Sequence, residues 1–134
     1  MAQSGKTRIL IVEDSKNTSG VLKEVLESEG YVVCLAGDGV AGIAMARREK
    51  PDLILLDLLL PKLNGYEVCN SIKRDNLTRH IPILVISTMD SPESLEKIKF
   101  CGAQNFMKKP YNLDDLLSEI KRLLVLPRAS GSAD

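Results

Sequence analysis

The sequence predicts an α/β fold, a doubly wound five-stranded parallel sheet with strand order 2-1-3-4-5 and five helices. Short apolar runs of strand length alternate five times with segments of helical periodicity. The runs are apolar throughout, which is typical of parallel strands that are buried on both faces. Because crossovers between parallel strands are right-handed, five successive strand–helix units favour this strand order.

The first half of the chain supplies three of these strands and the two helices between them. The first apolar run ends at Glu13, and the segment after it carries apolar residues at helical spacing until Gly30. Asp38 caps a second helix that is rich in small residues, and Pro51 ends it. The predicted elements are strands at Arg8–Val12, Tyr31–Ala36 and Leu53–Leu56, and helices at Lys16–Glu29 and Val40–Arg48.

The second half repeats the alternation, and each of its three helices starts with a recognisable cap. Asn64 with Glu67 three residues later resembles a capping box. Ser91 precedes a proline at the first helical position, and Asn112 begins the last helix. The predicted elements are helices from Asn64 to about Arg74, from Pro92 to Gly102 and from Asn112 onward, and strands at Ile83–Ile86 and Gln104–Met107.

Length and local composition predict one domain with short polar ends. The chain has 134 residues, and we expect the domain to span residues 7–126. Residues 1–6 are polar and lack an apolar signal core, so we expect a disordered N-terminus. Residues 127–134 are small and polar, which is typical of a linker or a disordered tail. No apolar stretch approaches the roughly 20 residues of a membrane span.

The charge balance disfavours a DNA-binding regulator, and the cysteine content disfavours a secreted protein. The 18 Lys and Arg balance the 18 Asp and Glu, so the chain lacks the basic excess that nucleic-acid binding requires. Cys34, Cys69 and Cys101 are odd in number, far apart and outside any CxxC motif. We therefore expect reduced, packed thiols in a cytoplasmic protein.

Polar residues stand directly after four of the five apolar runs. They are Glu13 and Asp14 after the first, Asp57 after the third, Ser87 after the fourth and Lys109 after the fifth. In open α/β sheets, ligands bind beyond the carboxyl ends of the strands, near the point where the strand order reverses. We therefore expect these side chains to meet, although they lie up to 96 positions apart.

This set of side chains has the parts of a phosphoryl-transfer site. Three carboxylates that lie close together repel one another, and Mg²⁺ is their natural partner because it prefers oxygen ligands. Lys109 would face the remaining negative charge, and Ser87 would supply a hydroxyl donor. The candidate nucleophile is a carboxylate that forms an aspartyl phosphate, and Asp57 is best placed because its strand is central.

The sequence resembles the receiver domain of two-component response regulators, from about Thr7 to Leu126. Each matching fragment is short, but all of them occur in the right order and at the right spacing. The resemblance implies the flavodoxin-like (βα)5 arrangement of the fold. The matching fragments are Ile-Val-Glu13-Asp14, Leu-Leu-Asp57-Leu-Leu-Leu-Pro61, Asn64-Gly65, Ile86-Ser87 and Lys109-Pro110.

The resemblance implies a role for each residue of the site. Asp57 is the phosphoacceptor, and the donor is a phosphohistidine. Mg²⁺ is held by Asp14, Asp57 and the backbone carbonyl of Leu59, with Glu13 acting largely through water. Ser87 hydrogen-bonds the phosphoryl oxygens and Lys109 pairs with them. The resemblance also implies a cis peptide bond before Pro110.

The resemblance further implies a signalling switch, not a classical enzyme. Phe106 matches an aromatic position that swings inward as Ser87 moves toward the phosphate. Phosphorylation then shifts a pre-existing equilibrium at the surface formed by the fourth strand, the fourth helix and the fifth strand. The domain assists its own phosphorylation and loses the phosphoryl group slowly, because Leu59 and Met89 are apolar and cannot orient water.

The implied partners are a cognate histidine kinase or histidine phosphotransfer domain, a downstream protein target, and a second copy in a phosphorylation-dependent dimer. No direct contact with nucleic acid or membrane is expected. One alternative is a degenerate receiver that binds partners without phosphorylation. A flavodoxin-like flavin binder is another, but Glu13 and Asp14 would repel its phosphate. A haloacid-dehalogenase-type phosphatase needs a second Asp where Leu59 stands.

Overall fold

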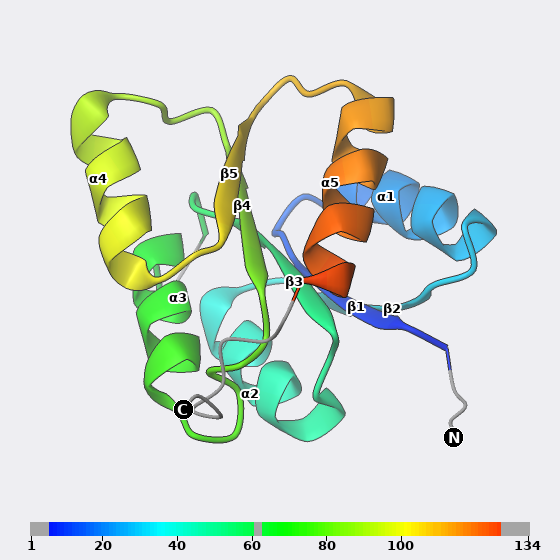
Figure 1. Cartoon of the computed structure of the whole chain (residues 1–134), viewed down its shortest axis with the longest axis horizontal. Coiled ribbons are helices and arrows are strands. Elements are labelled where there is room, and N and C mark those ends of the chain that lie inside the picture. Colours follow the sequence, from blue (N-terminus) through cyan, green and yellow to red (C-terminus); the bar gives the residue numbers. More distant parts are fainter. Residues whose placement is uncertain (1–5, 61–62, 127–134) are drawn as a thin grey trace.

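The computed structural model of the chain describes residues 6–60 and 63–126, and confirms the doubly wound parallel sheet (Figure 1). The strands lie in the order β2-β1-β3-β4-β5 and all pair in parallel. The expectations for the ends of the chain, residues 1–5 and 127–134, lie outside the described residues, and so does Pro61. The elements are β1 (Arg8–Val12), α1 (Lys16–Ser28), β2 (Val32–Ala36), α2 (Gly39–Glu49), β3 (Leu53–Asp57), α3 (Gly65–Arg74), β4 (Ile83–Ser87), α4 (Pro92–Cys101), β5 (Asn105–Lys108) and α5 (Leu113–Val125).

The boundaries of several elements differ from the prediction by one residue or a few. Tyr31 lies outside β2 because its backbone N–H still donates to the Leu26 carbonyl of the preceding helix, at 3.1 Å. Asp57 and Ser87 are the last residues of their strands instead of the first residues after them. The parallel ladder extends to both, since Asp57 pairs with Ile86 and Ser87 with Lys108.

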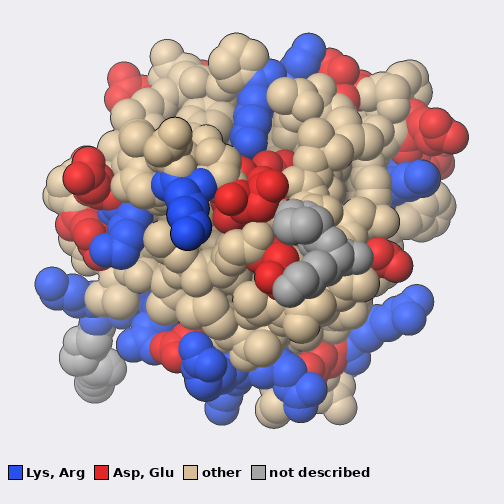
Figure 2. Space-filling view, turned by 180° about the vertical axis from the view of Figure 1, so that it is seen from behind, with Lys and Arg blue, Asp and Glu red and all other residues tan. Residues whose placement is uncertain are grey.

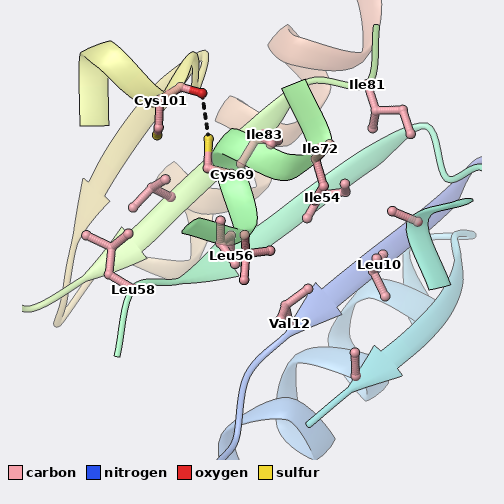
Figure 3. Close-up of a cluster of buried hydrophobic side chains, with 14 of the residues drawn as sticks. Leu10, Val12, Ile54, Leu56, Leu58, Cys69, Ile72, Ile81, Ile83 and Cys101 are labelled. Carbon is pink, nitrogen blue, oxygen red and sulfur yellow. Dashed lines mark hydrogen bonds between the residues drawn. The ribbon is translucent and has the colours of Figure 1, made fainter. Parts of the chain in front are cut away.

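Helices cover both faces of the sheet, and each face has its own buried core. Figure 1 shows α1 and α5 on one side, with α2, α3 and α4 on the other. The α1/α5 core contains alternate strand residues together with side chains such as Leu26 and Ile120. The opposite core contains the other strand residues with Ile72, Cys69 and Cys101 (Figure 3). Both sides of β1, β3 and β4 are therefore buried, which explains their continuous apolar sequences.

All five helices start with a side chain that caps the first turn. Because each helix follows its strand directly, these caps lie toward the carboxyl edge of the sheet, where the positive ends of the helix dipoles gather. Asn64 and Glu67 form the predicted capping box. The capping side chains are those of Ser15, Asp38, Asn64, Ser91 and Asn112.

Three further properties bear on function. Within the described ranges, no helix is long and apolar enough to cross a membrane. Figure 2 shows Lys and Arg interspersed with Asp and Glu over one face of the molecule. All three cysteines are free thiols, and Cys69 and Cys101 are buried.

Candidate functional site

Three carboxylates gather at the carboxyl edge of the sheet, and we call Glu13, Asp14 and Asp57 the acidic cluster. One carboxylate oxygen from each residue lies within 4.8 Å of the others. β1 and β3 are neighbours with Val12 opposite Leu56, so the residues that follow this pair emerge side by side. Glu13 and Asp57 are only 7% and 8% exposed, whereas Asp14 is open to solvent.

Lys109 is the cation of this site. Its Nζ lies 3.2 Å from Oε1 of Glu13 and 3.2 Å from Oδ2 of Asp57, so it bridges the two buried carboxylates. The backbone N–H of Lys109 donates to the carbonyl of Ser87 at 2.9 Å, which ties the end of β5 to the end of β4. The bond between Lys109 and Pro110 is cis, as the resemblance implies.

The protonation equilibria reflect the crowding of charge. Burial raises the pKa of Glu13, and the nearby charge of Asp57 adds to this shift, while a hydrogen bond from Ser15 and the charge of Lys109 oppose it. Burial alone would lower the pKa of Lys109, but its hydrogen bonds and charge attraction to Asp57 and Glu13 outweigh burial and raise it. Lys109 is therefore firmly protonated, while Glu13 resists ionisation.

Backbone groups that the sequence does not reveal hold the carboxylates in place. The N–H of Ser15 donates to Oε2 of Glu13 at 3.1 Å, and the N–H of Leu59 donates to Oδ1 of Asp57 at 3.0 Å. Sequence reasoning also misses Tyr111, which lines the same small cavity as Glu13, Asp57 and Lys109. The sequence offers one indication that Tyr111 belongs to the site, namely its position two residues after Lys109.

Ser87 and Phe106 stand on the two strands beyond the acidic cluster. Ser87 is fully buried at the end of β4, next to the strand that ends in Asp57, and its Oγ accepts a hydrogen bond from the Met89 N–H at 3.0 Å. Phe106 lies in β5 opposite Val85, is half-buried, and packs against the α2/α3/α4 core. Ser87 therefore lies at the carboxyl edge of the sheet with the acidic cluster, whereas Phe106 lies two residues before the end of β5 and away from that edge.

The chemistry of the acidic cluster fits a hard divalent cation. It presents carboxylate oxygens from three residues at one point, two of them shielded from water. Oxygen-only donor sets with one or two carboxylates are typical of Mg²⁺ sites that keep several waters. Leu59 contributes its amide to Asp57, and its side chain is 55% exposed. The residues present can therefore accept Mg²⁺ at this edge.

The sequence matches the response regulator receiver domain over residues 9–121, which is most of the chain. The chain belongs to the family of response regulator receiver domains. Receiver domains are signalling modules, and the acidic cluster fits a receiver site. Membership in this family disfavours the flavin-binding and haloacid-dehalogenase alternatives.

Two relatives and one solved structure illustrate the similarity. Protein PilH of Pseudomonas aeruginosa is 37% identical over 117 residues, which cover 87% of this chain and 97% of PilH. RpaA of Synechocystis, a DNA-binding dual master transcriptional regulator, is also 37% identical over 87% of this chain. This receiver chain spans 48% of the length of RpaA, and the DNA binding belongs to that longer protein.

The solved structure is the receiver domain of the sensor histidine kinase PA1611 from Pseudomonas aeruginosa. Its TM-score is 0.83 at 29% identity, and the alignment covers 90% of this receiver chain and 98% of that one. It holds a magnesium ion in its active-site cleft.

Proposed function

We propose that this receiver domain accepts a phosphoryl group on Asp57 from a phosphohistidine donor and signals through a conformational population shift. The observation that carries the proposal is the position of Asp57. It is buried at the end of the central strand, inside the acidic cluster, and paired with Lys109 at 3.2 Å. A buried carboxylate with an adjacent ammonium is a suitable nucleophile for phosphoryl transfer, where positioning and charge neutralisation supply most of the catalysis.

In the transfer, an Asp57 oxygen forms a bond to phosphorus while the bond from phosphorus to the donor imidazole nitrogen breaks. The Leu59 N–H already donates to Oδ1, which fixes the plane of the carboxylate and leaves the other oxygen facing Lys109. Lys109 then pairs with the phosphoryl oxygens, and the buried hydroxyl of Ser87 donates to them.

The acidic cluster supports a magnesium-dependent reaction. Asp14, Asp57 and the carbonyl of Leu59 would hold the ion, and Glu13 would act largely through water. When bound, Mg²⁺ neutralises charge that builds up on the transferring phosphoryl group. Asp14 is the one exposed member, so its carboxylate is free of burial and open to an arriving cation.

The switch that we propose couples Ser87 to Phe106. A groove of about 650 Å³ runs between α4 and β5, and Phe106 lines it together with Leu95 of α4. This groove offers room into which the ring can move when the Ser87 hydroxyl, which accepts a hydrogen bond from the Met89 N–H, donates its proton to the phosphate. The surface of β4, α4 and β5 would then change shape for a downstream protein.

The partners that we propose are a histidine kinase or histidine phosphotransfer domain as donor and a protein target as receiver of the signal, with a phosphorylation-dependent dimer as one form of output. The balanced charge of the chain supports contact with proteins and not with nucleic acid. We propose a cytoplasmic location without membrane attachment, since its free thiols fit a reducing compartment.

The decisive experiment is Asp57→Asn. With Mg²⁺ and acetyl phosphate, wild type should gain one phosphoryl group by intact mass and Asp57→Asn should gain none. Asp52→Asn is the matched control, because Asp52 precedes the same strand at its other end and accepts a hydrogen bond from the Arg8 N–H, at 2.8 Å. Equal labelling of wild type and Asp57→Asn would refute the assignment. Absence of label on wild type would favour the phosphorylation-independent module.

The phosphorylated form should be long-lived. Leu59 and Met89 flank the site, and neither side chain carries a polar group to orient an attacking water. Wild type labelled with acetyl phosphate should, once the donor is removed, lose the phosphoryl group over minutes or longer. Leu59→Asn should shorten that lifetime, because an amide at an exposed position beside Asp57 can hold a water. A half-life of seconds for wild type would contradict this account.

A further inference from the structure

Two cysteines from different helices meet on the face of the sheet covered by α3 and α4. The thiol of Cys69 in α3 donates to the backbone carbonyl of Cys101 in α4, at 3.2 Å (Figure 3). The Cys101 thiol in turn donates to the carbonyl of Ile98 at 3.1 Å. Cys69 is 0% exposed and Cys101 is 3% exposed, so the two cysteines adjoin each other inside the core between α3 and α4.

We propose that Cys69 and Cys101 form a redox site in which a hydroperoxide oxidises the two thiols to a disulfide between α3 and α4. Cys101 is the attacking thiol and Cys69 is the resolving thiol. This site is separate from the acidic cluster and uses no residue of the phosphoryl-transfer machinery.

The surroundings of the pair distinguish the two sulfurs. A hydrogen bond that the Cys69 thiol can give to a Cys101 thiolate lowers the pKa of Cys101 and outweighs the opposing effect of burial, and the charge of Lys73 acts in the same direction. The same hydrogen bond, together with burial, raises the pKa of Cys69. Cys34, the third thiol, has its pKa raised by burial. Since the thiolate is the nucleophile, Cys101 should react first.

A small oxidant has a route to Cys101. A groove of about 320 Å³ lies between α3 and α4, and its lining includes Cys101 together with Tyr66, Lys97 and Phe100. Lys97 lies 5.5 Å from the centre of the Tyr66 ring, and Phe100 is 81% exposed. A peroxide molecule is not much larger than water and fits this space, whereas a bulky disulfide such as oxidised glutathione does not reach the resolving thiol.

The chemistry balances in two steps. The Cys101 thiolate attacks one peroxide oxygen, so that a sulfur–oxygen bond forms, the oxygen–oxygen bond breaks, and the departing hydroxide takes a proton to become water. The Cys69 sulfur then attacks the sulfur of the resulting sulfenic acid and displaces hydroxide, which leaves as a second water with the proton of Cys69. Two electrons pass from the thiols to the peroxide, and a dithiol reductant reverses the change.

The disulfide would restrain the helix that borders the proposed output surface. α4 buries only Ser94, Ile98 and Cys101, so it is held by few residues, and Cys101 is the last of them. A covalent bond from this end to α3 would hinder any movement of α4 relative to the sheet. Only this consequence rests on the proposed switching function, and formation of the disulfide does not.

The test is peptide mapping of the whole protein. Wild type is treated with hydrogen peroxide, alkylated with iodoacetamide and digested with trypsin without reductant. We expect the peptides Leu63–Lys73 and Phe100–Lys108 to be joined, to separate with dithiothreitol, and to leave Cys34 alkylated. Free, alkylated Cys69 and Cys101, or a disulfide that contains Cys34, would overturn the proposal.

Two variants test the order of events. Cys69→Ala should stop at the Cys101 sulfenic acid, which dimedone labels, whereas Cys101→Ala should leave Cys69 unlabelled. Dimedone on Cys69 in Cys101→Ala would overturn the assignment of the attacking thiol. If either variant fails to fold, dimedone competition in wild type decides the same point, because the label should fall on Cys101 alone. Asp57→Asn should form the disulfide as wild type does, which separates this proposal from the phosphorylation of Asp57.

Discussion

The two edges of the sheet carry charge in opposite ways. At the amino edge, the Arg8 backbone donates to the Asp52 carboxylate at 2.8 Å, and the Arg8 guanidinium pairs with Glu49 at 3.0 Å. At the carboxyl edge, the three carboxylates of the acidic cluster lie together, and the Lys109 ammonium pairs with two of them, Glu13 and Asp57. The charges of the amino edge are paired and half-buried, whereas the carboxyl edge keeps an excess of negative charge on two buried carboxylates and one exposed carboxylate.

This difference separates an edge whose charges are paired from an edge whose carboxylates suit a cation. Repulsion between buried carboxylates destabilises the folded state unless a cation relieves it. Such a local conflict in an otherwise consistent fold is expected at a functional site. The amino edge carries no such conflict among the residues described, and its ion pair is partly open to solvent, where screening leaves it a small contribution to stability.

The largest expected effect comes from the backbone that shapes the carboxyl edge. The Gly65 N–H donates to the Leu58 carbonyl at 2.9 Å, and a Cβ at Gly65 would lie 2.5 Å from the Leu58 Cα and 2.8 Å from the Asp57 carbonyl oxygen. We expect Gly65→Ala to lower the free energy of unfolding by about 3 kcal/mol, since backbone and not a flexible side chain must move. Phosphorylation with acetyl phosphate should fall as Asp57 is displaced.

Gly20→Ala is the matched control for this substitution. Gly20 lies inside α1, and a Cβ at this position would have no neighbouring atom within 4 Å. Alanine should therefore raise the free energy of unfolding by about 0.5–1 kcal/mol, because it restricts the unfolded chain and favours helix. Urea denaturation measures both. Equal effects at the two glycines would show that the close approach at Gly65 has no energetic importance.

The second expected effect compares the cations of the two edges. Lys109→Met leaves two buried carboxylates without their partner and should lower the free energy of unfolding by about 2 kcal/mol in buffer without Mg²⁺. Arg8→Met breaks a pair whose side chains are 41% and 28% exposed, so it should cost less than about 1 kcal/mol. Urea denaturation in EDTA checks both, and equal losses would contradict the distinction between the edges. Lys109→Met should also abolish stable phosphorylation, whereas Arg8→Met should not.

Much of the carboxyl edge could be predicted because apolar runs in the sequence indicate the strands and roughly where they end. Apolar runs buried on both faces are continuous, and the rule that ligands bind beyond the carboxyl ends placed Glu13, Asp57 and Lys109 together despite their separation. The exact last residue of a strand depends on ladder hydrogen bonds and not on side-chain type. For this reason the sequence places Asp57 and Ser87 one residue outside their strands.

Other features could not be predicted because they depend on relative positions of elements. Packed thiols are expected at Cys69 and Cys101, but the sequence does not show how far α3 and α4 are rotated and shifted against each other, which decides whether the Cys69 thiol reaches the Cys101 carbonyl. The hydrogen bonds from the backbone N–H groups of Ser15 and Leu59 could not be predicted either, because every residue except proline carries such a donor. The ion pairs of Lys109 likewise depend on its side-chain conformation.

The smallest expected effect is on the pH dependence of stability, and it arises from Glu13. Its pKa is raised above the ordinary value of 4.5, chiefly by burial. The folded state therefore binds the Glu13 proton more tightly than the unfolded state does, and stability falls as pH rises from the ordinary pKa through the raised one.

Glu13→Gln lacks this titration, while the other carboxylates remain. The free energy of unfolding of Glu13→Gln minus that of wild type should thus increase across this interval and level off above it. Urea denaturation in EDTA at several pH values measures the difference. A difference that is constant or shrinks as pH rises would show that Glu13 ionises without cost, and that the carboxyl edge is as well compensated as the amino edge.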